Sequence, residues 1–133
     1  MDQQMKQIRK MMGWSRGDMK EVQHIGDLPK FTLEDFRDGE LVLPDNFLPR
    51  SLFSRDPVQG YSEQYVNLVG PSFQIRNVIV EKYERGQTKF TSGWPRFVEA
   101  EKFKIDDGVT LWSFKDRDDK QWLAMYYKYK SYV

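Results

Sequence analysis

From Val22 onward the chain consists of short stretches in which apolar and polar residues alternate, separated by turn residues about every ten positions. Successive side chains in a strand point to opposite faces of a sheet, so this period of two predicts β-strands. The pattern predicts strands at residues 28–33, 40–44, 64–69, 73–83, 88–91, 109–114 and 121–129. Many short strands with regular turns are typical of an antiparallel barrel or sandwich.

The fourth predicted strand changes phase along its length. Phe73 and Ile75 belong to one alternation of apolar residues, whereas Val78 and Val80 belong to the other. One extra residue in a strand produces such a change, so the pattern predicts a β-bulge between the two pairs.

The N-terminal segment, residues 1–19, is expected to extend from the barrel. Met1, Met5, Ile8 and Met12 recur at helical spacing, and basic residues lie largely between them. This favours a short amphipathic helix docked on the domain, or a frayed chain end. Two alternatives stay open: a basic extension that contacts phosphate or serves as a nuclear-import signal, and a surface for self-association.

Two further short helices are predicted inside the domain, which we expect to span residues 20–133. Residues 45–53 begin with an aspartate, a preferred N-cap, and carry apolar residues that can share one face. Residues 93–98 combine a glycine, which permits unusual backbone angles, with a proline suited to a first helical turn. Trp94 is best explained as a buried side chain that fixes this second helix, with base stacking as the alternative.

Composition narrows the classes of function. The 133 residues suffice for one domain with a hydrophobic core, and aromatic residues make up 15% of them. Charged residues make up 31%, but the formal net charge is only +1, so nucleic-acid binding would need a local basic patch. The sequence has no apolar run long enough for a bilayer and no signal-peptide core, which predicts a soluble intracellular protein without a membrane partner.

The residues that usually carry catalysis are scarce and scattered. The sequence has no cysteine, which excludes a thiolate nucleophile and a zinc site built on cysteine. His24 is the only histidine and has no adjacent carboxylate. The acidic run at 116–119 lacks the spacing of an EF-hand loop, and a charged hairpin tip explains it better. We therefore expect no enzymatic activity, no cofactor and no metal, and the many large aromatic residues argue against a ligand-binding barrel.

Three motifs, in this order, resemble those of plant B3 DNA-binding domains. They are LVLPDNF at 41–47, TSGWPRFV at 91–98 and KFKIDDGVTLWSF at 102–114. The resemblance covers roughly residues 20–130 and is greatest for the reproductive-meristem-like branch. It implies a mostly β fold, a seven-stranded open β-barrel or DNA-binding pseudobarrel with two short helices, besides the helix expected at the N-terminus. It also implies a transcription regulator that binds double-stranded DNA in the nucleus.

By the same resemblance, two loop arms would hold DNA in the major groove. The first arm would be the loop between the first two strands, at 32–40, and the second the hairpin tip at 82–89. Lysine and arginine suit phosphate, while arginine and glutamine have the forked groups that read guanine and adenine. The expected DNA-binding residues are Thr32, Arg37, Arg76, Lys82, Arg85, Gln87 and Lys89.

The first arm has an unfavourable charge for this role. Arg37 is its only cation among four carboxylates, and carboxylates repel phosphate. A solvated, non-binding loop is therefore an equal alternative for this arm, and Arg76 is open between a phosphate contact and an ion pair at the barrel rim. The alternative function is a protein-interaction or dimerisation module on a B3-like barrel with weak or lost DNA binding.

Overall fold

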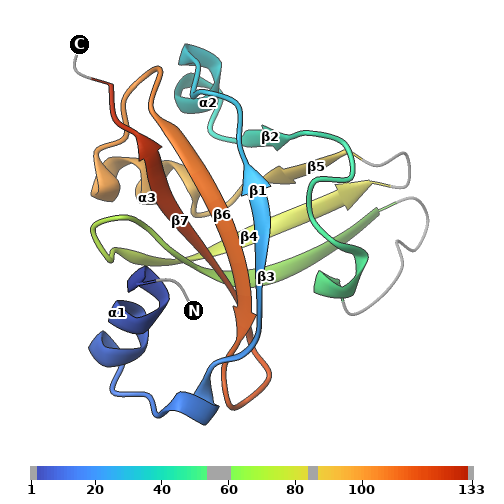
Figure 1. The fold of residues 1–133 in the computed structure, drawn as a ribbon. Helices are drawn as coiled ribbons and strands as arrows, with labels where there is room; N and C mark the ends of the chain where they lie inside the picture. The colour runs from blue at the N-terminus through green and yellow to red at the C-terminus, as the bar shows by residue number, and fades with distance from the viewer. Residues whose placement is uncertain (1–2, 54–60, 84–86, 132–133) are drawn as a thin grey trace.

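The computed structural model describes residues 3–53, 61–83 and 87–131, and within them seven strands form one curled sheet (Figure 1). The strands are β1 (Lys20–Asp27), β2 (Leu41–Leu43), β3 (Tyr61–Val69), β4 (Ile75–Tyr83), β5 (Thr88–Phe90), β6 (Gly108–Lys115) and β7 (Gln121–Tyr129). The helices are α1 (Gln3–Met11), α2 (Leu33–Arg37) and α3 (Trp94–Glu101), with 3₁₀ turns η1 (Arg16–Asp18) and η2 (Arg50–Leu52). The predicted fold class, a mostly β open barrel, is confirmed.

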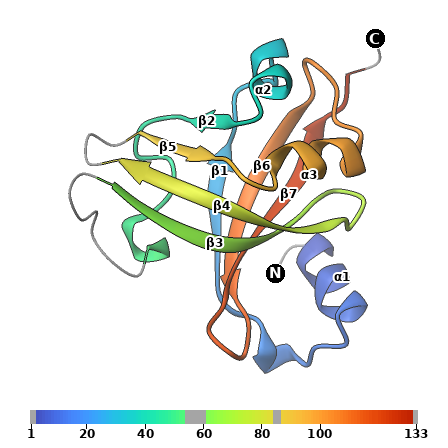
Figure 2. The same ribbon diagram turned by 180° about the vertical axis from the view of Figure 1, so that it is seen from behind.

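The order of the strands in the sheet is β1-β6-β7-β3-β4-β5-β2. All neighbouring pairs are antiparallel except β3 and β7, which run parallel. Because β1 and β2 are the two edges, the sheet curls without closing, as Figure 2 shows from behind. The pairing of β2 with β5 joins the segment that follows β1 to the β4–β5 hairpin.

An inner core fills the barrel, with Trp94 among its largest members. The Trp94 ring is fully buried, and its centroid lies 5.9 Å from those of Phe31 and Phe90 and 6.0 Å from that of Phe97. Such tilted aromatic pairs add to the energy of burial alone. The structural role expected for Trp94 is therefore observed, and its ring is not exposed for base stacking.

The start of α3 depends on Gly93. Its φ is +94°, and a Cβ atom added there would lie 2.3 Å from the carbonyl oxygen of Asn77 on β4. Only glycine combines this backbone angle with so close an approach to a neighbouring strand. Pro95 follows in the first turn, where no intrahelical N–H bond is lost.

A second core lies on the outside of the sheet, beneath α1 (Figure 1). Met5 and Ile8 of α1 are fully buried and belong to the same cluster as Phe114 and Trp122. Trp14, just after α1, packs edge-on against Trp122 with ring centroids 5.3 Å apart. The apolar stripe of the N-terminal segment is thus covered by the chain's own sheet, so self-association through this segment would have to use its exposed basic face.

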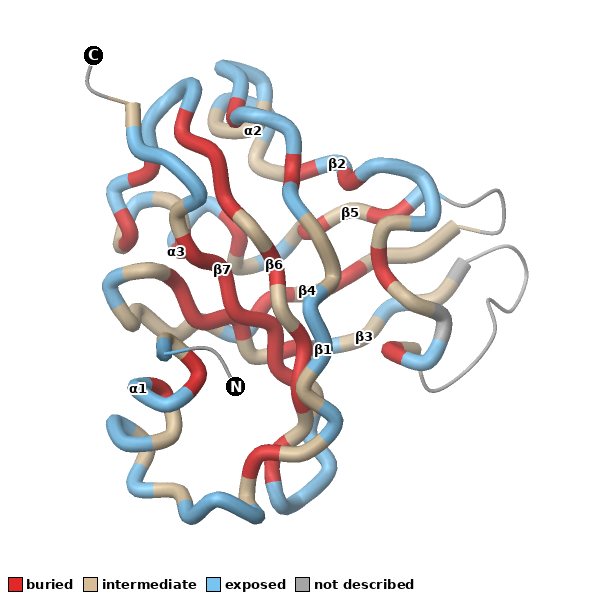
Figure 3. The backbone as a smooth tube through the Cα atoms, in the orientation of Figure 1, coloured by how far each residue is buried: buried red, intermediate tan, exposed pale blue. Residues whose placement is uncertain are grey.

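The sequence prediction for the position of the first strand is wrong. The first strand is β1, at 20–27, and not residues 28–33, which lead into α2. β1 is an edge strand whose side chains are mostly exposed or half-buried, so it has no clear apolar alternation (Figure 3). Leu28 and Phe31 are buried, but they are spaced three residues apart and lie in an irregular segment.

Two further local predictions are corrected. Residues 45–53 form only the short turn η2, which follows Pro49. The bulge expected in β4 is absent from the described register, which runs without a shift from the Tyr61–Tyr83 pair to the Val69–Ile75 pair. The apolar phase changes because Val78 and Val80 face the inner core, while Phe73 and Ile75 pack with the outer one.

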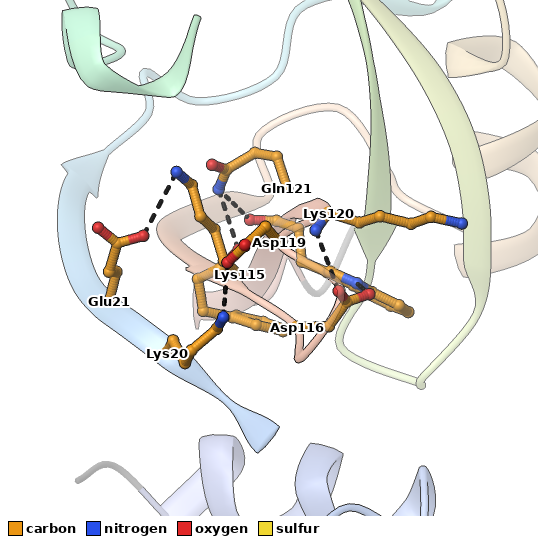
Figure 4. Close-up of polar contacts among 9 residues, drawn as sticks. Lys20, Glu21, Lys115, Asp116, Asp119, Lys120 and Gln121 are labelled. Carbon is orange, nitrogen blue, oxygen red and sulfur yellow. Dashed lines mark hydrogen bonds and ion pairs between the residues drawn. The ribbon is translucent and has the colours of Figure 1, made fainter. Parts of the chain in front are cut away.

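Ion pairs connect β1 to the β6–β7 hairpin at one end of the barrel (Figure 4). The Nζ of Lys20 lies 2.5 Å from a carboxylate oxygen of Asp119, and the Nζ of Lys115 lies 3.4 Å from one of Glu21. The Nε2 of Gln121 donates to the carbonyl oxygens of Phe114 and Trp122, each at 3.0 Å. The two ion pairs connect the irregular edge strand β1 to the hairpin, and the bonds from Gln121 lie within the hairpin itself.

Asp116 organises the turn between β6 and β7 (Figure 4). Its buried carboxylate accepts hydrogen bonds from the indole Nε1 of Trp122 at 3.0 Å and from the backbone N–H groups of Asp118 at 2.9 Å and Lys120 at 3.0 Å. Burial alone would raise the pKa of Asp116, but these hydrogen bonds to the charged form outweigh it and lower the pKa below its ordinary value.

We therefore expect acid to destabilise the domain partly through Asp116. A carboxyl whose pKa is lower in the folded state contributes stability that is complete above its unfolded pKa and is lost as the pH falls through the folded value. Asp116→Asn should cost about 1–3 kcal/mol at pH 7 and should flatten the fall in unfolding free energy between about pH 5 and pH 2. Urea unfolding at a series of pH values measures both effects, and an unchanged acid profile in the variant would contradict the assignment.

Candidate nucleic-acid interface

The first predicted arm, residues 32–40, contains the helix α2 rather than an open loop. The backbone N–H of Thr32 donates to Oδ2 of Asp35 at 2.8 Å, and this hydrogen bond caps the N-terminus of α2. The indole Nε1 of Trp94 donates to the carbonyl oxygen of Asp35 at 2.9 Å. The arm is therefore held in one orientation by the side chain at the centre of the inner core.

The only cation of this arm is already shared between carboxylates. The guanidinium of Arg37 lies 3.2 Å from Asp38 and 3.9 Å from Glu34. All three side chains are more than half exposed, so these contacts contribute little stability, but they reduce the positive potential that Arg37 offers to a phosphate.

Lys89, from the second arm, makes contact with the first arm. Its Nζ lies 3.3 Å and 3.4 Å from the two carboxylate oxygens of Glu40, and 5.5 Å from the ring centre of Tyr83. The hydrogen bond that Lys89 donates to the Glu40 carboxylate raises the pKa of Lys89 above its ordinary value. The structure thus joins the two predicted arms through a Lys89–Glu40 ion pair.

The other predicted residues of the second arm lie along the same hairpin. The Nζ of Lys82 lies 4.7 Å above the ring of Phe53, in the geometry of a cation–π contact. The side chain of Gln87 is exposed. Its backbone carbonyl oxygen accepts a hydrogen bond from the backbone N–H of Tyr83 at 2.8 Å, which joins the two strands of the hairpin. Arg85 lies outside the described residues.

Arg76 is not brought together with either arm. It lies near the start of β4 beside α3, where its Nη1 donates to the carbonyl oxygen of Ile75 at 2.8 Å. In the described parts of the chain it has no ion pair, so the barrel-rim pair considered from the sequence does not form there.

Two residues near these sites were not found from the sequence. In the sequence, Glu40 is only one of four carboxylates that would repel phosphate. Its closeness to Lys89 cannot be read from the sequence, because it depends on the pairing of β2 with β5. Arg96 lines a basic hollow with Arg76 and appeared in the sequence only as part of a structural motif. The helical spacing of Arg96 and Lys102 on either side of Glu99 was the one available signal.

His24 and the described carboxylates form no metal-binding cluster. The Nε2 of His24 lies 2.7 Å from Oγ1 of Thr110, on an exposed face beside the ring of Trp112. Within residues 3–53, 61–83 and 87–131, no three histidine, aspartate or glutamate side chains gather as a metal site would require. The helices in these ranges are too short and too polar to cross a membrane.

The comparisons with known proteins identify a matching family and similar solved structures. Residues 59–129 match the model of a family described as B3 domain-containing protein At2g31720-like. The solved structure of the hypothetical Arabidopsis thaliana protein At1g16640.1 is similar with a TM-score of 0.49 and 17% identity, over 84% of this chain and 97% of that chain. No curated protein matches at a significant level.

Proposed function

The matching family model covers more than half of the 133 residues, so the chain belongs to the At2g31720-like family of B3 domain-containing proteins, and on this basis we propose that it binds double-stranded DNA sequence-specifically as a plant transcription regulator in the nucleus. The observation that carries the proposal is the extent of this match, which includes the whole β4–β5 hairpin.

The proposed contacts divide between the two arms. Arg85 and Gln87 have the side-chain geometry to read base edges, while Lys82 and Lys89 would contact phosphates on either side of them. In the first arm, Thr32 and Arg37 are the candidates. The rigid attachment of α2 to Trp94 supports this use, because a preformed arm loses little conformational entropy on binding.

The Lys89–Glu40 pair places a condition on binding. Lys89, which the second arm would use to contact a phosphate, already forms an ion pair with the Glu40 carboxylate. A duplex must therefore displace Glu40 or contact Lys89 beside it, and the repulsion between Glu40 and phosphate makes displacement the more favourable course. Glu40 would then weaken binding in proportion to the stability of its pair with Lys89.

Replacing Arg85 and Lys89 together by alanine is expected to weaken duplex binding at least tenfold. Each phosphate contact that is lost lowers the magnitude of the slope of log K against log salt by about 0.9, so the loss of Lys89 should lower it by about 0.9, while the loss of Arg85 removes a base contact. Fluorescence titration of a labelled duplex at several salt concentrations measures both quantities. Unchanged binding would remove the second arm from the mechanism.

Glu40→Gln is a matched comparison within the same pair. It keeps the size of the side chain but removes the charge that holds Lys89, so we expect tighter binding and a steeper salt dependence. Lys89→Ala in the Glu40→Gln background should cancel the gain. A gain that survives without Lys89 would mean that Glu40 acts on DNA directly.

The charge of the first arm favours a second candidate function, a protein-interaction or dimerisation module. Glu34, Asp35 and Asp38 present an acidic surface on α2, and Arg37 is the single cation near them. This candidate predicts no binding to any duplex at low salt, together with a dimer or a complex in sedimentation experiments. Selection from random duplexes decides between the two, because an enriched motif would establish specific DNA binding and also give the target site.

A further inference from the structure

A basic hollow lies between α3 and the start of β4, away from the second predicted arm. It has a volume of about 480 Å³ and is lined by Arg76, Arg96, Glu99, Ala100 and Lys102. Three of these residues are cations and one is an anion. In Figures 1 and 2, α3 and the described ends of the β4–β5 hairpin lie on opposite sides of the molecule.

The two walls of this hollow are fixed relative to each other. At the start of α3, Gly93 packs against the backbone of Asn77. At its end, the buried carboxylate of Glu101 accepts the N–H and the hydroxyl of Ser72 at 2.9 Å and 2.8 Å, and the N–H of Gln74 at 3.0 Å. Charge-assisted bonds of this kind hold the β3–β4 turn onto the helix. The hollow is therefore a preformed feature of the fold.

The three cations of the hollow form no ion pair with carboxylates of the described residues. Arg96 and Lys102 form no ion pair within residues 3–53, 61–83 and 87–131. Arg76 donates one N–H to the backbone carbonyl oxygen of Ile75, and its other guanidinium N–H groups can donate to a bound ligand.

We propose that this hollow binds a phosphate group. Arginine forks match the geometry of phosphate oxygens, and a lysine adds a point charge, so two arginines and one lysine around a rigid hollow suit a dianion better than a neutral ligand. The phosphate belongs either to a nucleic-acid backbone or to a small phosphate-bearing molecule.

The test is a residue-resolved NMR titration of the full chain with two probes, inorganic phosphate and a short random-sequence duplex, each against sodium chloride at equal ionic strength. We expect the Arg76 and Arg96 Nε–H signals and the Ala100 amide to shift with at least one probe. A response to phosphate alone assigns a small ligand, and a response to the duplex assigns a nucleic-acid backbone. No shift beyond the chloride control with either probe would overturn the proposal.

Variants separate binding in the hollow from general attraction. Arg96→Gln with Lys102→Gln should weaken the response at least tenfold, because it removes two of the three positive charges that would contact the phosphate. Lys6→Gln with Lys10→Gln removes the same charge from exposed positions of α1 and should leave the response unchanged. Equal losses in both pairs would overturn the proposal. The arms are judged separately from the Gln87 and Lys89 signals, so failure of the hollow and failure of the proposed DNA binding give different results.

Discussion

Gly93→Ala is expected to destabilise the domain by about 2–5 kcal/mol, and to prevent folding if the domain is only marginally stable. The new methyl group would meet the carbonyl oxygen of Asn77 at 2.3 Å, and this oxygen belongs to the backbone of a central strand. A backbone atom in a sheet cannot move aside as the end of a flexible side chain can. The φ of +94° adds strain for any residue with a Cβ atom.

Thermal and urea unfolding of the variant measure this cost. Gly17→Ala is a matched control, because a Cβ at Gly17 meets nothing within 4 Å, and it should change the unfolding free energy by no more than about 0.5 kcal/mol. If the two variants had equal stability, Gly93 would not be the fixed point between α3 and β4. The rigid hollow inferred above would then lose one of its supports.

Ile8→Ala is expected to destabilise the protein by about 2–5 kcal/mol, the usual cost of truncating a fully buried aliphatic side chain. The cost has an upper limit, since α1 can detach once its docking energy is lost. Detachment would expose Val69, Phe114 and Trp122 on the outer face of the sheet. We therefore expect a change in tryptophan fluorescence and concentration-dependent self-association, besides a lower melting temperature.

The control is Gln7→Ala, at an exposed position on the same helix. Alanine favours the helical state, so this change should be neutral within about 0.5 kcal/mol. Full stability of the Ile8 variant would mean that α1 does not contribute to the fold. Self-association in the Gln7 variant would instead point to the exposed face of α1 as the surface involved.

The hairpin of β6 and β7 and the helix α3 were predictable because local sequence and final environment agree. Both faces of β6 and β7 are largely buried, so their near-continuous apolar runs are already those of core strands. The Gly93-Trp94-Pro95 sequence contains the backbone freedom, the buried ring and the first-turn proline that this helix needs.

The wrong predictions concern segments whose conformation is set by distant parts of the chain and not by the local sequence. β1 is an exposed edge, and the residues of α2 acquire their helical conformation from a cap and from a bond to Trp94, fifty-nine positions from Asp35. The change of apolar phase in β4 reflects a second core beneath the N-terminal helix α1, which is distant from β4 in the sequence. A local pattern cannot distinguish one strand with an irregularity from one regular strand covered on two faces.

The amino-acid sequence by itself determined the fold class, the turn and helix around Trp94 and the family resemblance, since these depend on periodicity and on residues close together in the chain. Only the tertiary structure decided that Glu40 neutralises Lys89, that Glu101 fastens the β3–β4 turn to α3 and that Arg76 shares a hollow with Arg96. The physical reason is that electrostatic interactions depend on distance in space, and strand pairing and helix docking bring together charges that lie 20 to 49 residues apart in the chain.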